Sequence, residues 1–178
     1  MDAPMWVFGY GSLIWDPGFP VAERQLARLS GWHRSFCMRS IHHRGSEAAP
    51  GLVLALDEAP GAACAGVAFR VAPGAEAETL AALRERELIS SAYLERVLPV
   101  TLPTGAHVPA LVYVIDPHHA QYCGGLALED QAQIIATARG GRGPNRDYLF
   151  ATATHLHDLG IADPDLDWLA ARVRALPG

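Results

Sequence analysis

The order of apolar and polar positions predicts strands in the first two thirds of the chain and helices in the last third. Short runs rich in β-branched and aromatic residues predict strands at 23–40, 52–56, 64–71, 97–102 and 108–115. Segments with helical composition and period predict helices at 75–89, 126–138, 148–159 and from Asp163-Pro164 onward. This order predicts an α+β fold, with a small closed or strongly curved mixed β-barrel and helices packed outside it.

Local residue chemistry suggests how three of these segments begin or end. The turn residues of Asp57–Gly61 predict a hairpin between the strands at 52–56 and 64–71. Asn145 is predicted to cap the helix at 148–159, after the glycine-rich stretch 140–143, which resembles a capping turn more than a phosphate loop. Pro164 suits the first turn of the last helix.

Composition narrows the class of protein. The chain has 178 residues, of which 50% are hydrophobic, and predicts one globular domain over 1–178. A net charge of -5 with only 14 basic residues argues against a nucleic-acid partner. We expect no membrane association and a cytoplasmic location, since no window approaches a membrane span. The three dispersed cysteines suit reduced core thiols, whereas the oligomeric state is not predicted.

The stretch Trp6–Trp15 is the most distinctive part of the sequence. A short strand-like run breaks at Gly9 and Gly11, and these glycines allow positive φ angles and a close approach of a ligand to the main chain. The amides that follow suit an anionic or polarised oxygen. Ser12 lacks the flanking glycines of a nucleophile elbow, so a hydrogen-bonding role is favoured. A glycine-rich bend that binds nothing remains the alternative.

Glu87 falls on the apolar side of the helix predicted at 75–89. At 100° per residue it shares a face with Leu80, Leu83 and Leu88. Partial desolvation there would raise the pKa of the carboxyl and suit it to accept a proton near neutral pH. The alternative is an ion pair with Arg84 or Arg86 at the edge of the apolar stripe.

Several collinear segments resemble ChaC-type γ-glutamylcyclotransferases over nearly the whole chain. The long opening motif at 6–15 is the most specific, and the shorter ones are Gly31–Arg34, His43–Gly45, Gly66–Arg70, Arg86-Glu87 followed by Tyr93, and Tyr148–Phe150. The resemblance implies a compact barrel-like fold and cleavage of reduced glutathione to 5-oxoproline and cysteinylglycine. It also implies that Glu87 is the proton acceptor.

The resemblance implies a substrate site around the opening motif. The loop that would hold the γ-glutamyl group consists of Val7, Phe8, Gly9, Tyr10, Gly11, Ser12 and Leu13. Tyr93 and Tyr148 are candidates to hydrogen-bond the substrate or orient Glu87, and Arg44 to hold a substrate carboxylate. Each of these three side chains could instead have only a structural role.

Neither a metal nor another cofactor is predicted. The histidines do not follow a recognised metal-ligand spacing, and cyclisation within a γ-glutamyl amide requires positioning rather than a cofactor. Two other functions remain open. One is a cyclotransferase for other γ-glutamyl amines or amino acids, and the other is a non-catalytic regulator that binds a γ-glutamyl ligand.

Overall fold

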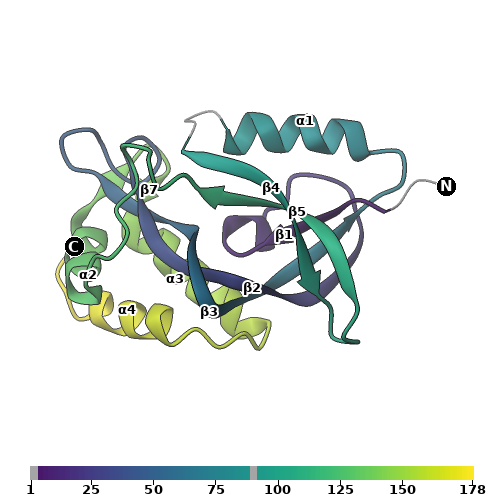
Figure 1. Cartoon of the computed structure of the whole chain (residues 1–178). Coiled ribbons are helices and arrows are strands. Elements are labelled where there is room, and N and C mark those ends of the chain that lie inside the picture. The colour runs from purple at the N-terminus through teal and green to yellow at the C-terminus, as the bar shows by residue number, and fades with distance from the viewer. Residues whose placement is uncertain (1–3, 89–91) are drawn as a thin grey trace. The chain divides into compact units, whose positions relative to one another are not determined.

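The computed structural model describes residues 4–88 and 92–178 (Figure 1). The strands are β1 (Trp6–Gly9), β2 (Val21–Ser40), β3 (Gly51–Val71), β4 (Tyr93–Thr101), β5 (His107–Ile115), β6 (Arg139–Gly140) and β7 (Gly143–Pro144). The helices are the 3₁₀ turn η1 (Ser12–Ile14), α1 (Glu76–Glu87), α2 (Leu128–Thr137), α3 (Asn145–Asp158) and α4 (Pro164–Arg174). Most predicted elements are confirmed, although Ile89, the last residue predicted for the helix at 75–89, lies outside the described residues.

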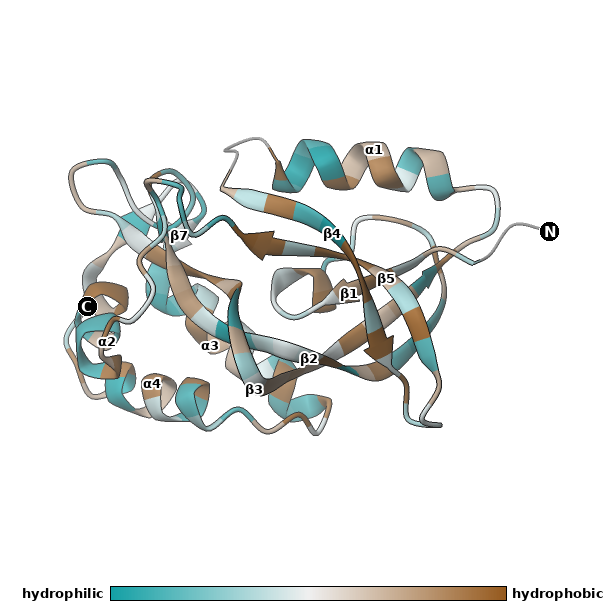
Figure 2. Cartoon of the chain, in the orientation of Figure 1, coloured by the Kyte–Doolittle hydropathy of each residue, from teal (hydrophilic) through white to brown (hydrophobic). Residues whose placement is uncertain are grey.

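Five strands close into a mixed barrel in the order β1-β3-β2-β4-β5. β1 is antiparallel to β3, with Trp6 opposite Arg70, and parallel to β5, with Trp6 opposite Ala110. β4 and β5 form an antiparallel pair, and the apolar residues of β5 appear as a brown stretch in Figure 2. The predicted α+β fold with a closed barrel is therefore confirmed.

The predicted hairpin between 52–56 and 64–71 is wrong, because β3 is one continuous strand from Gly51 to Val71. Gly61 has the positive φ expected of a turn residue, 87°, but the strand passes through it. β3 lies between β1 and β2 in the barrel, and its backbone is therefore paired with neighbouring strands. Pairing with distant segments outweighs the local preference of Asp, Pro and Gly for a turn.

The described chain contains two compact units. The first comprises the residues up to Arg34 together with Leu56–His119, and the second comprises Ser35–Ala55 and Ala120–Gly178. β2 and β3 each contribute residues to both units. The expectation of one domain over 1–178 stays a prediction.

In the first unit, alternation along the strands separates two apolar clusters. Trp6 and Phe8 of β1 belong to one cluster, whereas Val7 belongs to the other. That second cluster includes Leu83 of α1 and Tyr113 of β5. Successive strand residues point to opposite faces, so one face of β1 is left for contact with α1. Figure 1 shows α1 alongside β4.

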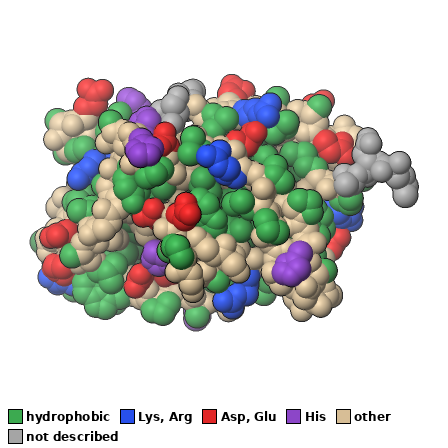
Figure 3. Space-filling view, in the orientation of Figure 1, with side chains coloured by type: hydrophobic (Ala, Val, Ile, Leu, Met, Phe, Trp, Pro, Cys, Tyr) green, Lys and Arg blue, Asp and Glu red, His purple; other side chains and the backbone are tan. Residues whose placement is uncertain are grey.

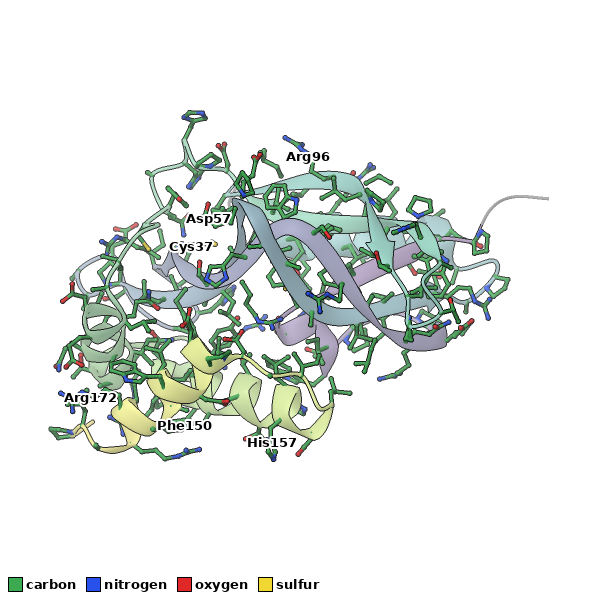
Figure 4. The ribbon with its side chains drawn as sticks, turned by 60° about the horizontal axis from the view of Figure 1, so that its bottom comes forward. Cys37, Asp57, Arg96, Phe150, His157 and Arg172 are labelled. Atoms are coloured by element: carbon green, nitrogen blue, oxygen red, sulfur yellow. The ribbon has the colours of Figure 1, made fainter. Side chains whose placement is uncertain are left out.

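In the second unit, α2, α3 and α4 contact one another. Asp163 caps α4 through a 3.1 Å hydrogen bond from the Leu166 amide, and Pro164 occupies the first turn, as predicted. Arg172 of α4 forms an ion pair with Glu129 of α2 at 2.8 Å. Figure 4 labels Arg172 and Phe150, which lie on α4 and α3.

The predicted N-cap at Asn145 is wrong. Asn145 is the first residue of α3, and its fully buried side chain bonds the backbone N–H and C=O of Leu52, each at 2.8 Å. The amide side chain therefore serves β3 and not its own helix. The glycine-rich segment before α3 forms the small β6–β7 hairpin, where a helix-capping turn was expected.

The structure also bears on the predictions about cysteine burial, membrane-spanning segments and surface charge. Cys37 and Cys64 are buried, as expected of core thiols, but Cys123 is only partly buried. In the described part of the chain, no helix is both long and apolar enough to cross a membrane. Acidic and basic side chains are interspersed on the face drawn in Figure 3.

Candidate active site

The loop after β1 is held by hydrogen bonds at Tyr10. The Tyr10 hydroxyl donates to the carbonyl oxygen of Tyr113 at 2.7 Å, and buried Arg34 donates to the Tyr10 carbonyl at 3.1 Å. The side chains of Val7 and Phe8 are buried in the two core clusters. This part of the predicted substrate loop therefore has a fixed backbone and core-facing side chains.

Gly9 of this loop is needed for space and not for positive φ. Gly11 has φ -145°, and Gly9 is an ordinary residue of β1, so neither position adopts the left-handed conformation that glycine allows. A Cβ on Gly9 would lie 3.1 Å from the Phe69 ring and 3.2 Å from the Leu13 Cβ. Glycine permits this close packing at the start of the turn.

The loop continues into η1, a single 3₁₀ turn. The Ile14 amide donates to the Gly11 carbonyl at 2.9 Å, and the Asp16 amide donates to the Ser12 carbonyl at 2.9 Å. The first N–H groups of a helical turn have no acceptor within that turn. The amides of Gly11, Ser12 and Leu13 lie at this start and suit a developing negative charge.

Glu87 is the last residue of α1, and its side chain is only 15% exposed. The desolvated position expected from the helical period is therefore confirmed. The Glu87 Oε1 lies 3.5 Å from Nε of Arg86, whereas Arg84 forms a two-bond ion pair with Glu95. Of the two arginines considered as partners, Arg86 is the one beside Glu87. The predicted rise in the pKa of Glu87 stays a prediction.

Sequence reasoning named Arg86 only as a possible partner of Glu87 and missed its contact with the loop. Its guanidinium donates to the Ser12 hydroxyl at 3.1 Å and to the Asp16 carbonyl at 2.6 Å. These bonds connect the end of α1 to the loop around η1. Arg86 directly precedes Glu87 in a segment that resembles the ChaC family, and this was the available signal. Helical spacing, however, places Arg86 off the apolar face of the helix.

Tyr93, Glu95 and Tyr113 extend the site along β4 and β5. Half-buried Tyr93 packs on the cluster that contains Leu13. The Tyr113 hydroxyl donates to Glu95 Oε1 at 3.0 Å. The pKa of Tyr113 is raised well above its usual range, chiefly because the hydroxyl is buried. The bond to Glu95 and the charges of Glu95 and Glu87 raise this pKa further. The pKa of Glu95 is lowered, chiefly by its hydrogen bond to Arg84.

Tyr113 and Glu95 were also missed from the sequence. Tyr113 lies in an apolar run of β5 that predicts a core residue, and Glu95 lies near the start of a strand. Only the pairing of β4 with β5, which places Glu95 opposite Tyr113, brings them together.

Arg44 and Tyr148 lie together in the second unit. Nη1 of Arg44 donates to the carbonyls of Arg142 at 3.0 Å and Pro144 at 3.1 Å, and its guanidinium lies 5.7 Å from the centre of the Tyr148 ring. The Tyr148 hydroxyl accepts a 3.3 Å bond from the Leu54 amide. Burial lowers the pKa of Arg44. Both side chains therefore have structural contacts, and their substrate roles stay predictions.

The predicted site residues thus fall into two groups. The loop at 7–13, Glu87 and Tyr93 belong to the first unit, and Arg44 and Tyr148 belong to the second. Among residues 4–88 and 92–178, no group of three or more His, Cys, Asp or Glu side chains is arranged to hold a metal ion.

Comparison with known proteins places this chain among its relatives. The family model described as ChaC-like protein matches residues 5–176. A glutathione-specific γ-glutamylcyclotransferase of Escherichia coli (strain K12) is 38% identical over 175 residues, covering 98% of this chain and 75% of that protein. The γ-glutamylcyclotransferase 2-3 of Arabidopsis thaliana is 37% identical over 178 residues, covering 96% of this chain and 88% of that protein.

A solved structure gives independent support for the fold. The crystal structure of a glutathione-specific γ-glutamyl cyclotransferase from yeast matches with a TM-score of 0.87 at 22% identity, covering 99% of this chain and 98% of that chain. Because the family model spans nearly the whole sequence and two relatives are 37% and 38% identical over 75% or more of their own length, the chain belongs to the ChaC-like family.

Proposed function

We propose that this protein is a glutathione-specific γ-glutamylcyclotransferase, which converts reduced glutathione to 5-oxoproline and L-cysteinylglycine. The observation that carries the proposal is the largely buried Glu87 carboxylate, connected through Arg86 to Ser12 of the glycine-containing loop. The name of the relative from Escherichia coli, at 38% identity over 175 residues, supports the same substrate.

The reaction needs positioning and one proton carrier. The α-amine of the γ-glutamyl group attacks its own γ-carbonyl carbon, the new C–N bond closes a five-membered ring, and the bond to the cysteine nitrogen breaks. Glu87 accepts the proton that the attacking amine loses. It then donates that proton to the departing amine, so the carboxylate is restored after each turnover.

The loop would bind the γ-glutamyl group and stabilise the tetrahedral oxygen. The amides at Gly11, Ser12 and Leu13 are suitable donors for that oxygen, because they begin a helical turn. Tyr93, which packs beside this loop, would contact the substrate or orient Glu87. Arg44 would hold a substrate carboxylate through a bidentate contact, and Tyr148 would hydrogen-bond the substrate or orient Glu87.

The proposal includes expectations for conditions and partners. It requires no metal or cofactor, because the nucleophile belongs to the substrate. The low number of basic residues favours a small-molecule substrate over nucleic acid, and we expect the protein to act in the cytoplasm.

Product analysis on two donors tests the function. The purified protein is treated with EDTA and incubated separately with reduced glutathione and with a γ-glutamyl amino acid, and products are identified by mass spectrometry. We expect 5-oxoproline and cysteinylglycine from glutathione alone. 5-Oxoproline from the second donor would indicate a broader cyclotransferase, and ligand binding without product from either donor would indicate a regulator.

A further inference from the structure

Each nitrogen of the Arg86 guanidinium lies near a different group. Nη2 donates to the Ser12 hydroxyl at 3.1 Å, Nη1 donates to the Asp16 carbonyl at 2.6 Å, and Nε lies 3.5 Å from Glu87 Oε1. Ser12 is the first residue of η1, and Asp16 follows its C-cap. One side chain of α1 therefore holds both ends of the turn and also lies beside the carboxylate.

The arrangement uses features that belong to arginine. A guanidinium is planar and presents donors in a fixed fork, whereas an ammonium is one point charge on a flexible stem. The side chain of Arg86 is 27% exposed and that of Glu87 is 15% exposed, so solvent screens this pair less than an open surface pair. Arg84 on the same helix is 53% exposed and is paired with Glu95 on β4.

We propose that Arg86 is a positioning residue, which holds the turn from Ser12 to Asp16 in a fixed register with the Glu87 carboxylate. This inference rests on the proposed function, in which the turn binds the γ-glutamyl group and Glu87 moves the proton. Arg86 itself exchanges no proton with the substrate. It acts through the loop and through the orientation of its neighbour.

Loss of this register should affect turnover more than folding. A misplacement of about 1 Å between reacting groups can cost on the order of 100-fold in rate. We therefore expect Arg86→Met to lower kcat by about 10-fold to 100-fold, with a smaller change in KM and a melting temperature close to that of the wild type.

A double-mutant cycle with Ser12 separates positioning from a general structural role. Ser12→Ala removes one of the groups that Arg86 holds, so the two substitutions should not be independent. We expect Arg86→Met to lower kcat several-fold less in the Ser12→Ala background than in the wild type. Effects that multiply independently would overturn the proposal, as would an Arg86→Met enzyme with the kcat of the wild type.

Two further variants complete the experiment. Arg86→Lys retains the charge and is combined with Ser12→Ala in the same double-mutant cycle, so the test does not depend on folding of the Met variant. We expect Arg86→Lys to keep partial activity, because one ammonium cannot hold all three groups. Arg70→Met is the matched control, because Arg70 is similarly exposed, 30%, and is paired with Glu23 at 3.0 Å. Its kcat should stay within about twofold of the wild type, and its effect should be independent of Ser12→Ala.

The outcomes separate the two proposals. A wild-type protein that forms no 5-oxoproline would refute the proposed function and this inference together. An active wild type with independent effects at Ser12 and Arg86 would refute only the inference.

Discussion

At the residue scale, Glu87 differs from Glu85 of the same helix in its surroundings. Its side chain is largely buried and lies beside Arg86, whereas Glu85 is exposed. A carboxylate that solvent reaches poorly can exchange a proton with a bound amine without competition from bulk water. The proposed chemistry therefore depends on the location of the Glu87 carboxylate and not on the number of acidic residues in the helix.

Replacing Glu87 with glutamine should abolish turnover. The amide has a similar volume but cannot accept the proton, so we expect kcat for 5-oxoproline formation to fall by at least about 100-fold. Isothermal titration should still detect glutathione binding. Glu85→Gln, on the exposed side of the same helix, should keep the activity of the wild type. An active Glu87→Gln enzyme would remove Glu87 from the mechanism.

At the element scale, α1 is connected to β4 by charge as well as by apolar packing. Arg84 forms two hydrogen bonds with Glu95, at 3.0 and 2.9 Å, and Glu95 also accepts from the Tyr113 hydroxyl. These contacts lower the pKa of Glu95 in the folded protein, with the bond to Arg84 as the largest cause. Protonation of Glu95 would therefore weaken the connection between the helix and the strand.

The lowered pKa of Glu95 predicts a loss of stability in acid. A carboxyl whose pKa is lower in the folded state contributes stability above its unfolded pKa, and that contribution is lost as the pH falls through the folded pKa. We expect the free energy of unfolding to fall more for the wild type than for Glu95→Gln between pH 7 and about pH 3. Urea titrations at several pH values measure this. Parallel curves for the two proteins would contradict it.

Asn145 connects α3 to β3 and should be costly to remove. Its side chain is fully buried and bonds both backbone polar groups of Leu52, so Asn145→Ala would leave a donor and an acceptor unsatisfied. Each such group costs about 1–3 kcal/mol. We expect chemical denaturation to show a loss of about 2 kcal/mol or more. Gln133→Ala, which removes an exposed side-chain hydrogen bond, should change stability by less than about 0.5 kcal/mol.

At the scale of the whole molecule, the two compact units share two strands. β2 belongs to the first unit up to Arg34 and to the second from Ser35, and β3 passes between units at Ala55-Leu56. Neither unit is a continuous segment of chain. This arrangement supports the prediction of one domain, since unfolding one part of a strand would disturb the pairing of the rest.

We therefore expect a single cooperative unfolding transition. Tryptophan fluorescence and far-ultraviolet circular dichroism, followed in the same urea titration, should give coincident curves with one midpoint. The four tryptophans at 6, 15, 32 and 168 give fluorescence probes in both units. Two separated transitions would show that the units unfold independently and would contradict the single-domain prediction.

Local sequence determined much of the secondary structure and the partial burial of one side chain of the candidate site, Glu87. The periods of α1 and the other helices, the apolar β-branched runs of β4 and β5, and the Asp163-Pro164 start of α4 are visible within a few residues of chain. The partial burial of Glu87 also follows from local pattern, since helical spacing alone places it on the apolar face. The resemblance to the ChaC-like family added the loop at 7–13 to the candidate site, and its role in binding stays a prediction.

Contacts between distant residues decided the rest. β3 continues through Asp57–Gly61 because neighbouring strands satisfy its backbone, and Asn145 turns from its own helix to Leu52, 93 residues away. Arg86 meets Ser12 across 74 residues, and no local pattern specifies that pairing. Sequence period fixes which way a side chain points, but only the folded chain decides which hydrogen-bonding partner it meets there.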